Sequence, residues 1–294
     1  MEHLRWTIPE SDRPVLHRPV LVVAFEGWND AGDAATTAVE RIGDQVEATK
    51  VAGIDPEPFY DFNATRPFVR IDGEGGRRIE WPANDLKFAA FDRDGDAAGD
   101  AAPARHDLIV LRGVEPQLRW RTFAGEIAEF AAEAGVELVV SLGALIADVA
   151  HSRPTTVFGT SADPTLCARL DLEPSNYEGP TGIVGVLHDA CRQAGVGSVS
   201  LWASVPSYVP HASSPKAALA LLDRFGTLAG LPILGGDLVE EAADYERQID
   251  ELVEADDETA AYVRDLERRY DESMGPDSGD NLISELEQFL REQN

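Results

Sequence analysis

The chain has 294 residues, 44% of them hydrophobic, and a formal net charge of −28. This length fits one large domain or two modest ones, and the apolar fraction is enough for a core without disulfide or metal staples. The negative charge repels nucleic acid and anionic membrane surfaces, so neither is expected as a partner.

The cysteines and the first residues bear on the compartment. Cys167 and Cys191 lack metal-ligand spacing, which favours a reducing environment. Residues 1–18 mix charges and prolines, and no signal peptide is visible there. No uncharged apolar run approaches the length of a transmembrane helix. We therefore expect a cytoplasmic protein that does not span a membrane.

The first predicted unit is a strand, a turn and a helix. Residues 20–25 form a continuous apolar, β-branched run, as strands buried on both faces do. The chain then turns, and Asn29 or Asp30 can cap an alanine-rich helix over residues 31–42. Such a unit is typical of the start of an α/β fold.

The same alternation continues along the chain. The aromatic and glycine-rich segment 59–81 is predicted to form short strands or a hairpin, with a turn at residues 73–76. Residues 92–105 have no hydrophobic period and are predicted to form a flexible acidic loop. The other predicted elements are strands over 49–53, 86–91, 108–111, 137–142, 155–159 and 198–205, and helices over 120–134, 164–170, 179–194 and 215–228. This order predicts a three-layer α/β/α sandwich around a mostly parallel mixed sheet.

The composition changes at residue 237. Residues 237–294 hold 20 acidic residues and 5 arginines, a net charge of −15. Apolar residues keep helical spacing from Ile249 to Tyr270, and again from Leu282 to Leu290. Because such stripes must cover a surface, we predict an α/β/α domain over 1–236 and an ordered, acidic helical extension over 237–294. The extension is expected to pack on its own domain or on a sister subunit.

The turn after the first strand lies where open α/β sheets usually bind ligands. Glu26, Asp30 and Asp33 already bring negative charge to the helix start, and a Gly-x-Gly-x-x-Gly spacing is absent. A capped helix is therefore favoured over a nucleotide site. An intermediate interpretation is a recognition turn for a polar ligand or a partner loop, formed by Trp28, Asn29 and Asp30.

The residues of metal and catalytic sites give no complete set. Asp148 and His151 would lie one turn apart on a helix, but no third ligand is visible, so no metal and no cofactor is expected. Ser141 lacks the first glycine of a nucleophile elbow. Ser207 and His211 are close enough in sequence for a hydroxyl–imidazole pair, although a loop rich in serine and proline often only caps the next helix. No catalytic residue is assigned.

A second turn places an aromatic residue and an acid before a helix. Gly179, Pro180 and Gly182 are ordinary turn residues, and Thr181 is a candidate N-cap. The predicted ligand- or partner-binding residues are Trp28, Asn29, Asp30, Gly143, Tyr177, Glu178, Ser207, Tyr208 and His211.

Three segments, in this order, resemble the PAC2 (proteasome assembly chaperone) family in its actinobacterial branch: residues 27–35, 177–183 and 206–216. The resemblance extends from about residue 18 to the end. It implies a phosphorylase/hydrolase-like α/β/α fold followed by C-terminal helices, and homo-oligomers such as trimers. It also implies an assembly-chaperone-like role with proteasome subunits as partners.

Two hypotheses follow. The first is a non-enzymatic interaction protein of the assembly-chaperone kind; the ending Leu290-Arg291-Glu292-Gln293-Asn294 lacks the hydrophobic–tyrosine–any-residue motif that some relatives insert into proteasomes. The alternative is a small-molecule enzyme, a hydrolase or a nucleoside-phosphorylase-like transferase, that uses the strand-end loops at 28–30, 143–145 and 207–211.

Overall fold

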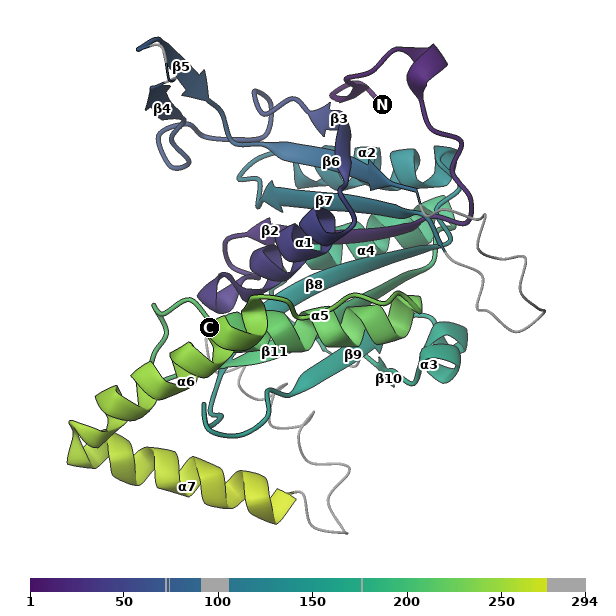
Figure 1. Ribbon diagram of the computed structural model, residues 1–294. Helices are drawn as coiled ribbons and strands as arrows, with labels where there is room; N and C mark the ends of the chain where they lie inside the picture. The colour runs from purple at the N-terminus through teal and green to yellow at the C-terminus, as the bar shows by residue number, and fades with distance from the viewer. Residues whose placement is uncertain (72, 74, 91–105, 176, 274–294) are drawn as a thin grey trace.

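The structure is a computed structural model, and it describes residues 1–294 except 72, 74, 91–105, 176 and 274–294. A nine-stranded sheet with helices on both faces forms the body of the molecule (Figure 1). The three-layer α/β/α arrangement predicted from the sequence is therefore confirmed. The loop predicted at 92–105 and the last predicted helix, at 282–290, lie outside the described residues.

The sheet is mixed, with a parallel centre. Its strands are β1 (Leu4–Trp6), β2 (Val20–Glu26), β3 (Thr49–Ile54), β6 (Asn84–Ala89), β7 (Leu108–Val114), β8 (Leu138–Ala147), β9 (Val157–Ser161), β10 (Glu173–Pro174) and β11 (Ser198–Pro206). Their order across the sheet is β1-β3-β6-β7-β2-β8-β11-β9-β10. The four strands from β7 to β11 are parallel to one another, whereas β1, β3 and β6 on one side and β9 on the other pair antiparallel. The carboxyl ends of the central strands therefore share one edge.

Helices cover both faces of this sheet. α1 (Ala34–Gln45), α3 (Pro164–Leu170) and α5 (Pro215–Ala229) pack on one face. α2 (Trp120–Glu133) and α4 (Ile183–Ala194) pack on the other. β2 contributes alternate residues to both cores: Val20, Val22 and Ala24 to the first, and Leu21, Val23 and Phe25 to the second. Burial on both faces explains why this strand is an unbroken apolar run.

The first helix begins three residues later than predicted. Residues Ala31–Asp33 form a 3-10 turn, because Gly32 and Asp33 have left-handed backbone conformations with φ of 59° and 52°. The helix proper starts at Ala34. None of the helices in the part of the chain that the structure describes has the length and hydropathy needed to cross a membrane.

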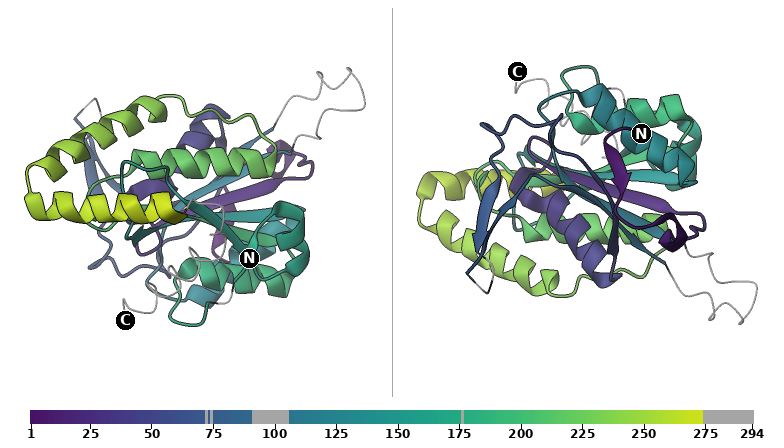
Figure 2. Two further views of the ribbon diagram at one scale, coloured as in Figure 1. Left: turned by 90° about the horizontal axis from the view of Figure 1, so that it is seen from below. Right: turned by 90° about the horizontal axis from the view of Figure 1, so that it is seen from above.

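Two helices extend from the body after α5. α6 (Leu238–Glu254) and α7 (Asp257–Ser273), together called the arm below, form a helical hairpin (Figures 1 and 2). α6 is buried along Leu238, Ala242, Tyr245, Ile249 and Val253, and α7 at Val263 and Leu266. A small apolar cluster joins Ile249 and Val263 to Tyr208 and Val209, from the loop after β11. The arm thus packs on its own chain.

A second, two-stranded sheet projects from the other end of the body. β4 (Phe68–Ile71) and β5 (Arg77–Glu80) pair antiparallel, with Phe68 opposite Glu80 and Ile71 opposite Arg77. This is the hairpin expected between residues 59 and 81. Trp81 at its base packs against Phe62, with ring centroids 4.8 Å apart.

Candidate interaction site

Segments 27–35, 177–183 and 206–216 come together at the carboxyl ends of the central parallel strands. The first follows β2, the second leads into α4, and the third follows β11. Groups of the first segment hydrogen bond directly to the third and share one acceptor with the second. The first segment is therefore the centre of the site.

Asn29 is the buried contact between the first and second segments and is only 2% exposed. Its Nδ2 donates to Oε1 of Glu115 at 3.0 Å, and the backbone N–H of Ile183 donates to the same oxygen at 2.9 Å. Gly182 lies so close that a Cβ added there would stand 2.5 Å from Nδ2 of Asn29. The carbonyl of Asn29 accepts from the N–H of Ala144 at 2.8 Å. One glutamate thus joins the ends of β2 and β7 to the start of α4.

Glu115 also takes the place of the expected helix cap. The sequence predicts Thr181 as the N-cap of α4, and this prediction is wrong, because Gly182 occupies that position without a side-chain cap bond. The free N–H of Ile183 is satisfied instead by Glu115, from the end of another strand. A carboxylate at a helix N-terminus is favourable for the helix dipole. The start of α4 is therefore fixed by a tertiary contact.

Asp30 holds the start of α1 and is 6% exposed. Its Oδ1 accepts from the N–H of Ala35 at 2.7 Å and from that of Thr36 at 3.3 Å, and its Oδ2 accepts from the hydroxyl of Thr36. The N-cap position of α1 is Asp33, so the prediction of Asn29 or Asp30 at that position is wrong. Asp33 makes no side-chain cap bond, and the Asp30 carboxylate accepts from the N–H groups of the first turn instead. Burial raises the pKa of Asp30 to about 6, although its hydrogen bonds act in the opposite direction.

This shift predicts a pH-dependent stability. The folded Asp30 carboxyl keeps its proton up to about pH 6, whereas the ordinary pKa of an aspartate is 3.8, so the folded state binds more protons across this interval. Its contribution to the free energy of unfolding therefore falls as the pH rises. The matched variant is Asp30→Asn, which keeps an oxygen acceptor for both N–H groups and does not titrate. Between about pH 4 and 7, the free energy of unfolding of the wild type should fall by up to about 3 kcal/mol relative to that of the variant. Urea unfolding of both proteins across this range measures the difference, and parallel profiles would contradict it.

The third segment closes over the first turn. The N–H of Ser214 donates to the carbonyl of Gly32 at 2.7 Å, and the hydroxyl of Ser213 donates to Oδ2 of Asp33 at 3.0 Å. Gly32 has φ of 59°, and a Cβ there would lie 2.9 Å from the Cβ of Ser214. Both the left-handed backbone and the close approach of the third segment therefore require glycine at this position.

Ser207 and Tyr208 lie beneath the arm. The hydroxyl of Ser207 donates to Oδ1 of Asp148 at 2.8 Å and lies 3.4 Å from the hydroxyl of Tyr262 on α7. The hydroxyl of Tyr208 accepts from the backbone N–H of His151 at 2.8 Å, and its ring meets that of Tyr262 edge-on, with centroids 6.1 Å apart. Both candidates thus contact the chain's own C-terminal helices.

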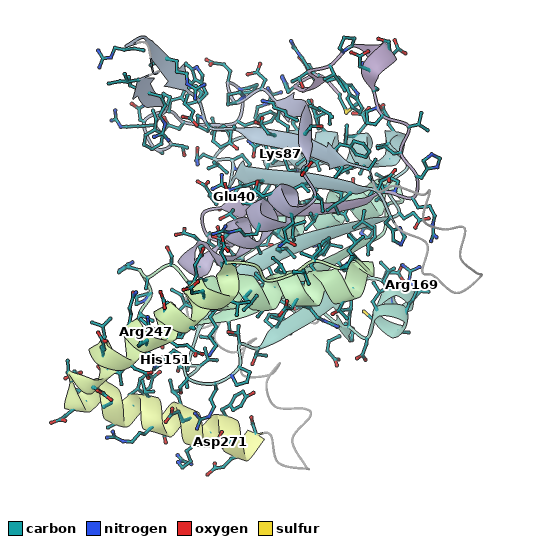
Figure 3. The ribbon with its side chains drawn as sticks, in the orientation of Figure 1. Glu40, Lys87, His151, Arg169, Arg247 and Asp271 are labelled. Atoms are coloured by element: carbon teal, nitrogen blue, oxygen red, sulfur yellow. The ribbon has the colours of Figure 1, made fainter. Side chains whose placement is uncertain are left out.

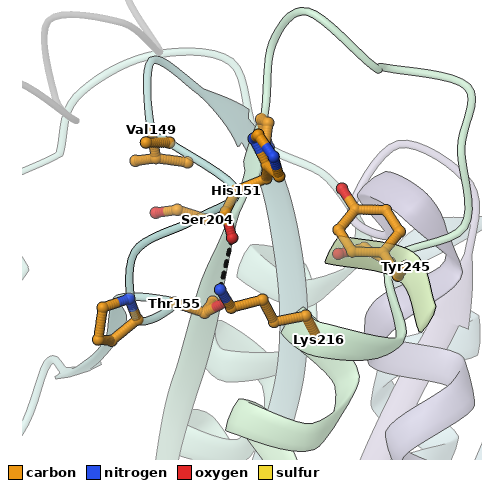
Figure 4. A pocket seen from close by; sticks show the side chains of 10 residues that line it. Val149, His151, Thr155, Ser204, Lys216 and Tyr245 are labelled. Carbon is orange, nitrogen blue, oxygen red and sulfur yellow. Dashed lines mark hydrogen bonds between the residues drawn. The ribbon is translucent and has the colours of Figure 1, made fainter. Parts of the chain in front are cut away.

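His151 and Lys216 complete the attachment of the arm. Nε2 of His151 lies 2.9 Å from Oδ1 of Asp250 on α6. Nζ of Lys216 donates to the carbonyl of His151 at 2.5 Å and to the carboxylate of Glu246. Figure 4 shows His151 and Lys216 with Tyr245 around a pocket, whose volume is about 10 Å³. That volume holds about one water molecule and is too small for a metabolite. The role of His151 and Lys216 is therefore to hold α6 against the body.

α7 is fastened by an arginine. Arg153 donates to both carboxylate oxygens of Asp271 at 2.8 Å and to Glu267 at 3.2 Å. Figure 3 shows Asp271 on α7 and His151 beside the arm. A two-pronged arginine–carboxylate pair fixes direction as well as distance. The loop after β8 therefore anchors both helices of the arm.

A sequence model of the PAC2 family matches residues 24–253, which include all three segments and nearly the whole of α6. The chain belongs to the PAC2 family. The resemblance carried by the three segments is thereby confirmed. A PAC2 family protein from Streptomyces avermitilis is 48% identical, with a TM-score of 0.75 over 83% of this chain and 99% of that chain.

Other solved structures share the PAC2 fold. A proteasome-assembly chaperone homologue from Mycobacterium tuberculosis is 40% identical, with a TM-score of 0.70 over 83% of this chain and 99% of that one. An archaeal proteasome activator from Pyrococcus furiosus is 18% identical and has the same fold, with a TM-score of 0.67 over 86% of this chain and 99% of that one. No curated protein sequence matches the chain.

Three of the nine candidate residues of this PAC2 protein are exposed near the strand ends. Trp28 is 57% exposed, and Glu178 and His211 are exposed as well. Tyr177 is half-buried, as are Ser207 and Tyr208, and its hydroxyl donates to the carbonyl of Pro180 at 2.8 Å. The three exposed side chains are available to a partner, and their proposed role stays a prediction.

Gly143 has a packing role in the PAC2 fold. It is buried in β8, and a Cβ added there would lie 2.5 Å from the Trp202 ring of β11. The indole therefore occupies the space that a side chain at position 143 would need. The close approach of an aromatic ring explains a glycine inside a central strand.

Reasoning from sequence missed Glu115 and the pair of Ser141 with His188. Glu115 directly follows a buried strand, which is the signal that could have drawn attention to it. Oγ of Ser141 lies 2.8 Å from Nε2 of His188, whose Nδ1 lies 2.8 Å from Oγ of Ser198. Ser141 is fully buried, and burial lowers the pKa of His188 to about 4. A neutral imidazole between two hydroxyls links α4 to β8 and β11.

The segment with Asp148 and His151 is a turn and not the helix that a metal pair would need. Asp148 accepts from Ser207, and His151 contacts Asp250 of α6. Across the described ranges, no group of three His, Cys, Asp or Glu side chains is arranged to hold a metal ion. Both residues serve the attachment of the arm.

Proposed function

We propose that this PAC2 protein is a non-enzymatic interaction protein that forms homo-oligomers and binds a proteasome-type complex as an assembly-chaperone-like factor. The observation that carries the proposal is the 40% identity to the proteasome-assembly chaperone homologue from Mycobacterium tuberculosis, over 99% of that chain. Identity at this level across the whole fold supports a shared class of partner.

The chemistry of the site supports the proposal. Asn29 is engaged with Glu115, the Asp30 carboxylate with the start of α1, and Ser207 with Asp148. Two of these hydrogen bonds join different segments at the strand ends, and the third joins the turn after β2 to α1, which fits a role in shaping a surface. The motif residues therefore serve to hold the strand-end loops in a fixed shape.

The surface that these loops present has apolar side chains. Trp28 follows β2 and is 57% exposed, and Leu118 follows the neighbouring strand β7 and is 48% exposed. Tryptophan is among the residues that contribute most to binding energy in protein interfaces. We assign Trp28 as a main contact with the protein partner.

The experiment is a binding measurement with purified proteasome particles and with unassembled proteasome subunits from the same organism. Wild-type protein should bind one of the two, and Trp28→Ala should weaken binding by about tenfold or more, as expected for an interface tryptophan. Leu234→Ala is the matched control. Leu234 is 71% exposed and hydrogen bonds through its backbone to Gln45 at the far end of α1, about 17 Å along that helix from the turn.

The outcomes separate the parts of the proposal. Equal binding by wild type and Leu234→Ala, with loss in Trp28→Ala, supports both the partner and the surface. Equal binding by all three proteins would place the contact elsewhere on the molecule. Lack of binding by the wild type to either preparation would contradict the proteasome partner.

A further inference from the structure

The β4–β5 hairpin is exposed along its whole length. All four residues of β4 and all four of β5 are exposed. In a strand, successive side chains point to opposite faces, so within the described part of the chain nothing covers either face of the two strands. A two-stranded hairpin standing alone in water is only marginally stable. This hairpin therefore needs a surface to pack on.

One face of the hairpin is apolar. Val69 pairs with Ile79, and Ile71 pairs with Arg77, so these four side chains share a face. Val69 and Ile79 are each 52% exposed, and Ile71 is 73% exposed. We call Val69, Ile71 and Ile79 the hairpin patch. Apolar side chains grouped in this way are typical of an interface.

The opposite face of the hairpin is charged. Arg70 pairs with Arg78, and Phe68 with Glu80. Arg70 donates to Glu80 at 2.6 Å and stacks over the Phe68 ring, with its guanidinium 5.5 Å from the ring centroid. The two faces thus differ as those of a strand pair do when one face meets a partner and the other meets water.

The charge of the hairpin differs from that of the chain. Four arginines and three acidic residues give residues 66–81 a net charge of +1, in a chain of net charge −28. Residues 237–273, by contrast, hold fifteen acidic residues and four arginines, a net charge of −11. Two hairpins would not attract each other, whereas a hairpin and an arm would.

The far end of the arm offers a complementary surface. Leu252, near the end of α6, is 62% exposed. It is surrounded in sequence by the exposed acids Glu251, Glu254, Asp257 and Glu258. We call Leu252 with these four acids the arm tip. An apolar side chain with an acidic rim matches an apolar patch that has Arg77 on the same face.

The arm tip of a chain does not cover the hairpin of the same chain. Figure 1 shows the hairpin and the arm at opposite ends of the molecule, separated by the width of the central sheet. The hairpin lies beyond β6, and the arm lies beside the loops after β8 and β11. A contact between the two surfaces therefore requires a second copy.

We propose that the hairpin patch of one copy docks on the arm tip of a second copy. This inference rests on the homo-oligomer of the proposed function and names the surfaces that form it. The contact is head-to-tail, since each copy gives its hairpin to one neighbour and its arm tip to another. Such a contact closes into a ring when its rotation permits.

The experiment uses two variants of the full chain. The hairpin variant carries Ile71→Glu and Ile79→Glu, which place negative charge where the acidic tip would dock. The arm variant carries Leu252→Glu, which keeps a good helix former on α6. Val15→Glu is the matched control, because Val15 is 80% exposed and lies outside both surfaces. The masses of all proteins, alone and mixed, are measured by sedimentation equilibrium.

We expect the wild type and the control to sediment as multiples of the 31.8 kDa chain, and each variant alone as a monomer. A mixture of the two variants should give a dimer, because the intact arm of one fits the intact hairpin of the other at a single junction. A mixture that stays monomeric would overturn the head-to-tail contact, and so would a hairpin variant that still assembles. A monomeric wild type would contradict the homo-oligomer itself, and leave proteasome binding to be judged by the separate experiment with Trp28→Ala.

Discussion

Gly182→Ala should destabilise the protein by about 2–3 kcal/mol, although it adds a single methyl group. The backbone at this position has φ of −88° and ψ of −172°, which any residue adopts, so the cost is steric. The new Cβ would stand 2.5 Å from Nδ2 and 2.6 Å from Oδ1 of Asn29. Asn29 would have to move away from Glu115 and leave a half-buried carboxylate oxygen with fewer donors. Urea unfolding of the variant and the wild type measures the loss.

Gly125→Ala is the control for this prediction. Gly125 lies inside α2, and a Cβ added there meets no atom within 4 Å. This change should therefore stabilise the helix by up to about 1 kcal/mol, because alanine loses less backbone entropy than glycine. The same substitution is thus expected to have opposite signs at two glycines. Equal changes in the free energy of unfolding at both positions would contradict the prediction, because they would mean that Asn29 moves aside at little energetic cost.

The centre of the sheet could be predicted from sequence because its strands are buried on both faces. The run over residues 20–25 has the length and the β-branched composition of a buried strand, and β2 lies there. β1 could not be predicted in the same way. It has three residues, and its start is held by the carboxylate of Glu126, which accepts from the N–H groups of His3 and Leu4. A contact across more than 120 residues has no local signal.

The sequence identifies the segments that form the site, but it does not predict the side-chain contacts between them. The turn residues and the acids around position 30 identify a helix start, and in the structure the Asp30 carboxylate accepts from the N–H groups of its first turn. The start of α4 needed Glu115, which is 68 residues from Ile183 in sequence. Sequence spacing likewise suggested Ser207 and His211 as a pair, whereas Ser207 donates to Asp148, 59 residues away. Local patterns predict that a helix begins near each of these turns, whereas its first residue and its side-chain partners depend on which strands become neighbours.

The sequence predicts that the helices of the arm are amphipathic, but it does not predict the surface on which they pack. The spacing of Ile249 and Val253 requires a covered stripe, and both are buried. The surface that covers them comes from the loop after β11, with Tyr208 and Val209. The polar side chains that bind the arm come from the loop after β8. The third motif segment therefore has a role in holding the arm that its own composition does not reveal.

Ile249→Ala should release the arm and cost about 2–4 kcal/mol, the range for truncation of a buried isoleucine. Ile249 is 3% exposed and lies in the cluster that joins α6 and α7 to the loop after β11. This cluster is small, so the loss of one large side chain removes much of its apolar contact. The polar contacts that remain, such as Asp250 with His151 and Asp271 with Arg153, have partly exposed carboxylates. Ion pairs of this kind contribute little on their own.

Limited proteolysis tests this release directly. In Ile249→Ala, cleavage between α5 and α6 should become much faster than in the wild type, while the α/β body stays intact. Gln248→Ala is the matched control on the same helix, because Gln248 is exposed, lies outside the arm tip, and its truncation should leave cleavage unchanged. The two positions are neighbours in sequence, but only Ile249 faces the chain's own body. If both variants were cleaved at the wild-type rate, the polar contacts alone would hold the arm on the body. The apolar cluster would then contribute little to its attachment.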